Sequence, residues 1–160
     1  MERKVQAQYS DHGFGFPVTL LDVPMVKVRG CWTPSIDYNA LALVVLKSLV
    51  RLDGRLTGSQ VKFIRLHFEM TLQQFARRLG LTHPAVVKWE RRANRPTGMN
   101  WTTEKDIRLF VSKRLSGTAK DFYGLYGCLE QVAPMRAVKL SVGAGSSAKR
   151  SKFGSAPSEH

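Results

Sequence analysis

Three short amphipathic segments in quick succession constrain the fold of this chain more than any other feature. Apolar residues recur at helical spacing over 61–68, 72–79 and 86–89, and the stretch Asn94–Gly98 then stops the pattern. Helices this short are not stable alone in water, because nucleating a helix costs more than a few hydrogen bonds return. The three segments are therefore expected to pack on one another as a single unit.

The junction between the second and third segments predicts two helices joined by a tight turn. Gly80 can leave the first helix in a left-handed conformation, and Ala76 is small enough for two helices to touch there. Thr82 is placed to cap the next helix, and Pro84 falls in its first turn, where the missing N–H costs nothing. The next helix is therefore expected to begin at about His83.

The run from Thr71 to Glu90 resembles the helix-turn-helix of the Xre and Cro family, the lambda-repressor-like fold, and the resemblance extends over Leu56–Leu115. It implies that the helix beginning at His83 is a recognition helix that lies in the major groove of DNA. Its outward residues are then the candidates for base contact: His83, Pro84, Val87 and Lys88. A lysine can donate to guanine N7 or O6, whereas a proline offers only an apolar contact, for instance to a thymine methyl.

The same resemblance assigns roles to the residues around this helix. Leu72 stands where the family often has a glutamine that holds a phosphate, so Gln73 or a basic neighbour is expected to replace that contact. The expected phosphate contacts are Gln73, Arg77, Arg78, Thr82, Arg91, Arg92 and Arg95. The family pattern also implies that Glu90 pairs with Arg65. The expected structural supports are Arg65, Ala76, Gly80, Trp89 and Glu90, with Trp89 facing the core.

The distribution of charge favours a nucleic acid over other polyanions. The formal net charge is +13, and ten basic against three acidic residues give +7 within residues 51–95. The most apolar run, Ala40–Leu46, is far shorter than the roughly 20 residues that a membrane span needs. We therefore expect no membrane association and a soluble, cytoplasmic protein that joins the bacterial nucleoid when bound to DNA.

The chain divides by pattern into three parts. Residues 1–55 are expected to form a small β-β-α unit, with two short strands between Val18 and Arg29 bent at Asp22 and Pro24, and a helix capped by Asp37. Residues 56–133 hold the helix-turn-helix domain and two further helices, one capped by Thr102 and one over Lys120–Val132. Residues 134–160 are rich in Ser, Gly, Ala and basic residues, which predicts a disordered, flexible basic tail. The predicted fold class is mainly α.

No cofactor, metal or catalytic role is expected. Gly13-Phe14-Gly15 lacks the third glycine and the strand-to-helix setting of a nucleotide-binding loop. Cys31 and Cys128 have none of the spacings of a zinc site and are expected to be ordinary, half-buried, reduced thiols. The four histidines are scattered, so the sequence offers no catalytic constellation and the chain is not expected to be an enzyme.

Over Tyr9–Leu115 the chain also resembles antitoxins of the MqsA and HigA type, in which a small N-terminal unit precedes the helix-turn-helix. MqsA proteins usually hold zinc through N-terminal cysteines, and here there is only Cys31, so neither the metal site nor the toxin-binding role is carried over. The family implies a homodimer on a palindromic operator, with recognition helices about 34 Å apart. The two helices after the motif are the expected dimer surface, because their apolar faces exceed what the motif can cover.

Two functions follow from these patterns. The first is a sequence-specific, double-stranded-DNA-binding transcriptional regulator, a dimeric and antitoxin-like repressor of its own operon, with or without a toxin partner. The alternative is an adaptor or co-regulator that binds a protein partner, either a toxin or the transcription machinery, through its N-terminal unit or its tail.

Overall fold

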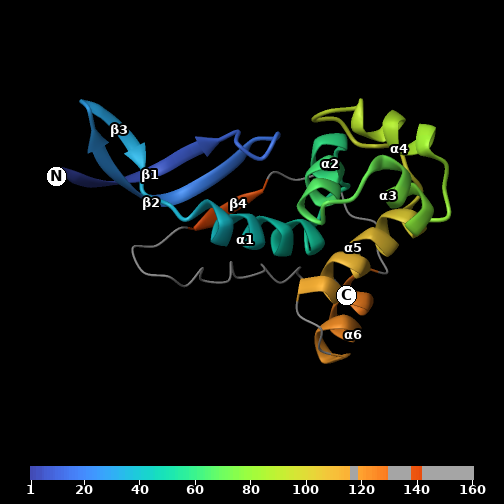
Figure 1. The fold of residues 1–160 in the computed structure, drawn as a ribbon. Coiled ribbons are helices and arrows are strands. Elements are labelled where there is room, and N and C mark those ends of the chain that lie inside the picture. The colour runs from blue at the N-terminus through green and yellow to red at the C-terminus, as the bar shows by residue number, and fades with distance from the viewer. Residues whose placement is uncertain (116–118, 130–137, 142–160) are drawn as a thin grey trace, which may run out of the picture.

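The computed structural model describes residues 1–115, 119–129 and 138–141. Within these ranges six helices accompany a small sheet, in agreement with the predicted mainly helical fold with a β unit. Figure 1 shows the sheet at one end of an elongated molecule and α3 and α4 at the other, with α1 between them. The elements in chain order are β1 (Arg3–Asp11), β2 (Val18–Val28), β3 (Cys31–Pro34), α1 (Tyr38–Val50), α2 (Gly58–His67), α3 (Leu72–Arg78), α4 (His83–Glu90), α5 (Trp101–Leu115), α6 (Ala119–Cys128) and β4 (Lys139–Ser141).

The sheet differs from the hairpin predicted within residues 18–29. β2 continues through Asp22 and Pro24, and it pairs antiparallel with both β1 and β3. Asp22 has a left-handed φ of 53°, which changes the side-chain alternation without reversing the chain. The buried residues of β2 are accordingly Val18 and Leu20 before it, and Val23 and Met25 after it. The N-terminal unit is therefore β-β-β-α, and the predicted β-β-α unit was wrong in its number of strands.

A short part of the predicted tail is also a strand. Lys139–Ser141 form β4, which runs parallel to β2 over Thr19–Leu21. Val138 is buried, and its carbonyl accepts a hydrogen bond from the Thr19 N–H at 3.3 Å. Val138 and Leu140 supply the apolar surface that makes this pairing favourable, so the expectation of disorder from residue 134 onward was wrong for residues 138–141. The rest of the predicted tail lies outside the described residues.

α1 joins the sheet to the helices. Asp37 caps it as predicted, since its Oδ1 accepts hydrogen bonds from the N–H groups of Asn39 and Ala40 at 3.0 and 3.2 Å. The Tyr38 hydroxyl donates to Oδ2 of Asp11 at 2.8 Å, which ties the start of α1 to the end of β1. Partial burial, together with this hydrogen bond, raises the pKa of Tyr38 to about 12.

α5 packs against α1 on one side and α6 on the other. The predicted cap, Thr102, lies inside the helix. Asn100 takes the capping role, because its Oδ1 accepts from the Thr103 N–H at 2.8 Å. Ile107 and Val111 are fully buried, so the apolar face of α5 that was expected at a dimer surface is covered within the chain itself. The last three residues of the helix predicted to end at Val132 lie outside the described ranges.

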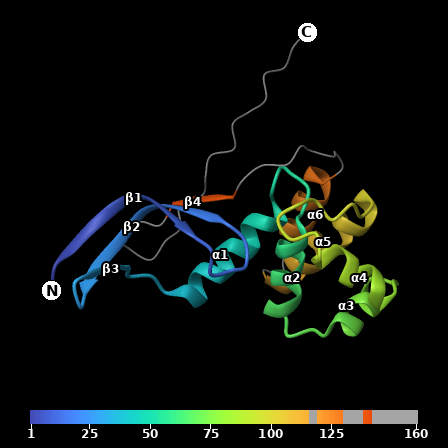
Figure 2. The same cartoon turned by 90° about the horizontal axis from the view of Figure 1, so that it is seen from above.

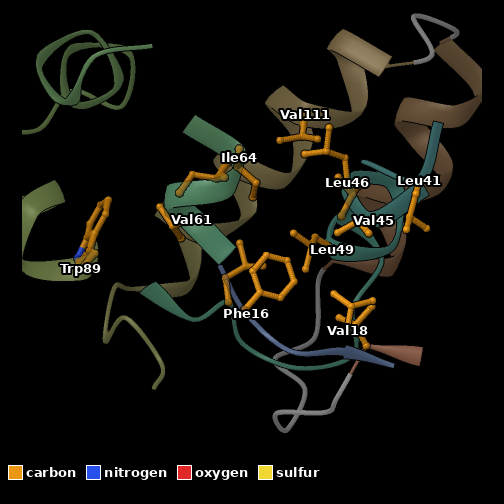
Figure 3. Packing of buried hydrophobic residues seen from close by; sticks show 14 of the residues in the cluster. Phe16, Val18, Leu41, Val45, Leu46, Leu49, Val61, Ile64, Trp89 and Val111 are labelled. Carbon is orange, nitrogen blue, oxygen red and sulfur yellow. The ribbon is translucent and has the colours of Figure 1, made fainter. Parts of the chain in front are cut away.

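One hydrophobic core runs through the whole molecule and includes residues of the sheet and of every helix. In the view of Figure 3, Val61 and Ile64 of α2 lie between Trp89 of α4 and the α1 residues Leu46 and Leu49. The same core therefore connects α4, at the far end of the molecule, with α1 and the sheet.

Among the described residues no helix is both long and apolar enough to cross a membrane.

A buried ion-pair network holds α5 against the loop that follows α1. Arg108 is 1% exposed and Glu104 is fully buried; Nη2 of the arginine donates to Oε1 of the glutamate at 2.7 Å. Oε2 of Glu104 also accepts from Nε of Arg55 at 2.7 Å. The Arg108 guanidinium donates to three carbonyls as well, those of Val50, Leu52 and Gly54. Burial lowers the pKa of Arg108, and the hydrogen bond to Glu104 opposes that shift.

Glu104→Ala is predicted to lower the free energy of unfolding by about 3–5 kcal/mol, because it leaves the buried Arg108 without its counter-charge. The matched control is Asp106→Ala on the same helix. The Asp106 side chain is 46% exposed in its ion pair with Arg78, so its loss is expected to cost about 0–1 kcal/mol. Urea denaturation of the three proteins measures both values. If both substitutions lower the free energy of unfolding equally, the buried network contributes no more to stability than the exposed ion pair.

Candidate nucleic-acid interface

α4 presents one face to solvent and is braced from behind. It begins at His83, as predicted, with a proline in its first turn. Val86 is fully buried and Trp89 is 8% exposed, so the tryptophan belongs to the core as expected. Thr82 occupies the N-cap position, but contrary to prediction its side chain makes no capping hydrogen bond. Its hydroxyl is therefore available to an external acceptor.

The four residues proposed for base contact lie together on the open side of α4. His83, Pro84 and Lys88 are exposed and Val87 is half-buried. They line a shallow concavity of about 400 Å³, and Arg91 joins them. The face therefore combines apolar surface with a lysine, an arginine and an imidazole, which suits the edge of a base pair beside a phosphate.

The turn between α3 and α4 is fixed by backbone hydrogen bonds. Gly80 has φ of 66°, and its N–H donates to the Arg77 carbonyl at 3.1 Å. The Leu81 N–H donates to the Ala76 carbonyl at 2.9 Å, which completes a Schellman motif. Ala76 is buried, as expected for a point where helices touch. Gly80 and Ala76 thus hold the two helices at one angle, and α3 packs directly on α4.

A nearly buried ion pair fastens the end of α4 to α2. The guanidinium of Arg65 and the carboxylate of Glu90 form two hydrogen bonds, Nε to Oε1 at 2.6 Å and Nη2 to Oε2 at 3.0 Å. A third bond runs from Nη1 of Arg65 to the Met70 carbonyl at 2.8 Å. The pairing expected from the family pattern is therefore present, and the two-pronged geometry restrains the rotation of α4 about its own axis.

A close backbone approach at Gly58 adds a second restraint, which the sequence reasoning missed. A Cβ on Gly58 would lie 2.2 Å from the Trp89 carbonyl oxygen and 3.0 Å from the Ala93 nitrogen. The chain after α4 then runs back beside the start of α2. Three hydrogen bonds join the two segments: Gly58 N–H to Arg95 O, Ser59 N–H to Ala93 O, and Thr97 N–H to Leu56 O. Only glycine allows α2 and α4 to approach this closely.

The residues proposed for phosphate contact belong to α3, to the N-cap of α4 and to the segment after α4, and Arg91 among them lines the concavity. Gln73, Arg77, Arg91, Arg92 and Arg95 are all exposed. Arg78 is placed differently, because its Nη1 lies 3.4 Å from Oδ2 of Asp106 and its guanidinium stacks over the Phe110 ring at 4.9 Å. Phe110 was expected only on the apolar face of its own helix and Asp106 had no assigned role, since nothing in their spacing points to α3.

The pairing of charges leaves a basic surface at this end of the molecule. Glu90, Glu104 and Asp106 each form an ion pair with an arginine. Within the described ranges, none of the remaining basic residues around α4 has a carboxylate partner, namely Arg77, Lys88, Arg91, Arg92 and Arg95. Half of the ten basic residues within 51–95 are therefore these five side chains on α3, on α4 and just after it.

The residues that could bind metal do not gather in the structure. No group of three or more His, Cys, Asp or Glu side chains with suitable geometry occurs in the described part of the chain. Cys31 and Cys128 are free thiols, and both are exposed, so the expectation that they are half-buried was wrong. Gly13 and Gly15 lie in the turn between β1 and β2, where they line a groove beside α2.

Comparison with protein-family models, curated proteins and solved structures gives no match. The arrangement of residues on α3 and α4 is therefore what supports a function.

Gly58→Ala tests whether the position of α4 depends on this close approach. The added methyl group meets backbone atoms that cannot move independently, so we expect a loss of about 1–3 kcal/mol in the free energy of unfolding and a displaced α4. Gly124→Ala on α6 is the matched control, because its Cβ would meet no atom within 4 Å and a helix interior gains about 0.5–1 kcal/mol from alanine. Thermal unfolding measures both effects, and equal responses of the two variants would contradict the argument.

Proposed function

We propose that this protein binds double-stranded DNA in a sequence-specific manner, with α3 and α4 forming a helix-turn-helix and α4 acting as the recognition helix. The supporting observation is that His83, Pro84, Val87 and Lys88 share one open concavity on a helix whose opposite face is buried. A helix that is rigidly braced and exposed on one side has the shape needed to enter a major groove about 12 Å wide.

The chemistry of this surface divides into two sets of contacts. Lys88 and His83 carry donors that can reach acceptors on base edges, and Val87 and Pro84 can pack on a thymine methyl. Arg77, Arg91, Arg92 and Arg95, on α3 and after α4, carry cations that form no ion pair within the described residues. Such cations position a protein on the phosphate backbone, whereas the central residues read the sequence.

The regulatory role is part of the same proposal. A small protein that reads DNA through one such helix usually needs two copies to reach useful specificity, and a two-fold dimer reads a palindromic site. The resemblance to Xre, Cro and antitoxin regulators favours a repressor of its own operon that acts in the cytoplasm. A toxin or another protein partner is compatible with this role but is not required by it.

Lys88→Ala and Arg77→Ala are predicted to affect DNA binding differently. Loss of Lys88 should reduce discrimination at one or two base positions by about 1–3 kcal/mol. Loss of Arg77 should weaken binding to all sequences alike and lower the slope of log K against log salt by about 0.9. Lys47→Ala on α1 removes the same charge from a helix away from this surface and serves as the control.

Mobility shifts against randomised DNA, repeated between about 50 and 200 mM salt, measure both quantities for these variants. The proposal fails if the wild type shows no preference among sequences, or if Lys47→Ala reduces affinity as much as the two variants on α3 and α4.

The C-terminal segment is predicted to add electrostatic affinity without adding specificity. Residues 142–160 contain Lys149, Arg150 and Lys152, and a deletion that begins at residue 142 leaves β4 intact. We expect this truncation to weaken binding to every sequence and to reduce its salt dependence. Replacing the three basic residues by glutamine at full length should have the same effect. A changed base preference in either variant would contradict the prediction.

A further inference from the structure

A groove of about 640 Å³ lies between α2 and the turn that joins β1 to β2. Figures 1 and 2 both show this turn beside α2. Phe14 of the turn packs edge-on against Phe63 of α2, with ring centroids 5.4 Å apart. Glu90 at the end of α4 and Ala93 just after it are also part of the lining. The groove is therefore bordered by the N-terminal unit, by α2 and by the end of α4.

α2 contributes five residues to this lining. Ser59, Lys62 and Leu66 are spaced by three and four residues, so they share one face of the helix, and Phe63 and His67 lie beside them. Leu66 is 53% exposed and Phe63 is half-buried, so apolar surface in the groove is open to a ligand. The five side chains thus combine apolar surface with an ammonium group, an imidazole and a hydroxyl.

The polar groups of these side chains have no polar partner within the described residues. Lys62 is exposed and forms no ion pair there. Within the same ranges the hydroxyl of Ser59 and the ring nitrogens of His67 form no hydrogen bond, and His67 contacts the rings of Phe63 and Phe68 instead. The donors on α2 are therefore available to an external acceptor.

Two carboxylates border the groove, one neutralised and one buried. Glu90 is the acidic residue of the lining, and its two oxygens accept hydrogen bonds from Arg65 at 2.6 and 3.0 Å. Asp11 is 5% exposed, and its oxygens accept from the Gly13 N–H and from a tyrosine hydroxyl. Lys62 is therefore the charge that no other lining residue balances, and the groove favours a ligand with negative charge.

We propose that this groove binds a small organic carboxylate with an apolar or aromatic body, and that the bound ligand is an effector of α4. The body packs against Phe14, Phe63 and Leu66, and the carboxylate accepts from Lys62. The volume is within the range of about 300–1,000 Å³ that is usual for small-molecule sites. A protein partner would need roughly 800 Å² of this surface, whereas Leu66 is the one large apolar side chain of the lining that is exposed.

The effector role rests on the proposed function, since it concerns the helix assigned to DNA. The groove borders contacts that fix α4: the Ser59 N–H donates to the Ala93 carbonyl at 2.9 Å, and Glu90 pairs with Arg65. A ligand that contacts both α2 and the end of α4 binds best when these segments are in place. It therefore favours the braced position of α4, and by linkage DNA and ligand raise each other's affinity.

Binding is tested with hydrocinnamate, whose phenyl ring and carboxylate are joined by two methylene groups. The matched control is hydrocinnamamide, which has nearly the same shape and no charge. Amide NMR spectra of the isotope-labelled full chain are expected to show saturable shifts in residues 13–15 and 59–67, with a Kd of about 1–5 mM for the carboxylate. The amide should bind about fivefold more weakly. Absence of saturable shifts, or equal affinity of the two compounds, would overturn the proposal.

Two substitutions of exposed residues locate the site. Lys62→Gln should weaken hydrocinnamate binding about fivefold, and Leu66→Ala about threefold. Lys47→Gln on α1 is the control, because it removes the same charge outside the lining. The same spectra show whether each variant is folded, and if Lys62→Gln is not, the comparison of the two compounds decides alone. Unchanged affinity in Lys62→Gln, or an equal loss in Lys47→Gln, would place the ligand elsewhere and overturn the proposal.

The effector role is tested by mobility shifts on the preferred DNA site. Hydrocinnamate at about 10 mM should raise the DNA affinity of the wild type about fivefold, with a smaller rise for Lys62→Gln and for hydrocinnamamide. If the ligand binds and DNA is read with sequence preference, but neither affects the other, the effector role is wrong. If the ligand binds but no DNA sequence is preferred, the site stands and the proposed function is wrong. DNA binding with sequence preference but without ligand binding leaves the proposed function intact and overturns this inference.

Discussion

The buried pair of Arg108 and Glu104 is the constraint on which the rest of the structure depends. Two charges have been removed from water, and such a pair is tolerated only when the remaining donors and acceptors are also satisfied. Arg108 meets most of this need with its two terminal nitrogens, which bond the carbonyls at and beyond the end of α1, while its buried Nε has no hydrogen-bond partner among the described residues. Glu104 accepts from Arg55 and from the Leu56 N–H at 3.0 Å. The loop between α1 and α2 thus has one favourable conformation, although its own sequence has little apolar character. The sheet and the end of the molecule that holds α3 and α4 are connected through it.

From this anchor the placement of α4 follows by short steps. Leu56 is held by Glu104, and the next two residues begin α2, where Thr57 and Gln60 form a capping box. Gly58 then lets the Trp89 backbone approach, and Arg65 in the last turn of α2 holds Glu90. Each step uses a backbone contact or a two-pronged ion pair, both of which tolerate little change in geometry. Such rigidity would favour the recognition role proposed for α4, because a rigid surface loses less conformational freedom on binding a partner.

The sequence predicted what depends on local chemistry and missed what depends on partners distant in the chain. The start of α4 at His83, the left-handed Gly80 and the Asp37 cap follow from residues within one turn of each other. β1 could not be recognised, because its exposed, polar residues are held by pairing with β2 and show no alternation of their own. Asp22 was interpreted as a bend between two strands. An aspartate that adopts a left-handed conformation looks the same in the sequence whether the chain reverses there or continues as one strand. Asn100 and Thr102 are both good caps, and only packing on α1 decides between them.

The candidate interface shows the same division. The residues proposed for base contact could be grouped from the sequence because they share one short helix, whereas the pairing of each arginine could not be predicted. Arg65 and Arg78 are both near α3 in sequence, yet one is neutralised by Glu90 and the other lies against Asp106. Acidic residues inside or beside the core thus remove cations from the surface selectively. Arg77, Lys88, Arg91, Arg92 and Arg95 form no ion pair within the described residues, so α3, α4 and the segment after α4 keep a basic surface although Arg65 and Arg78 are paired.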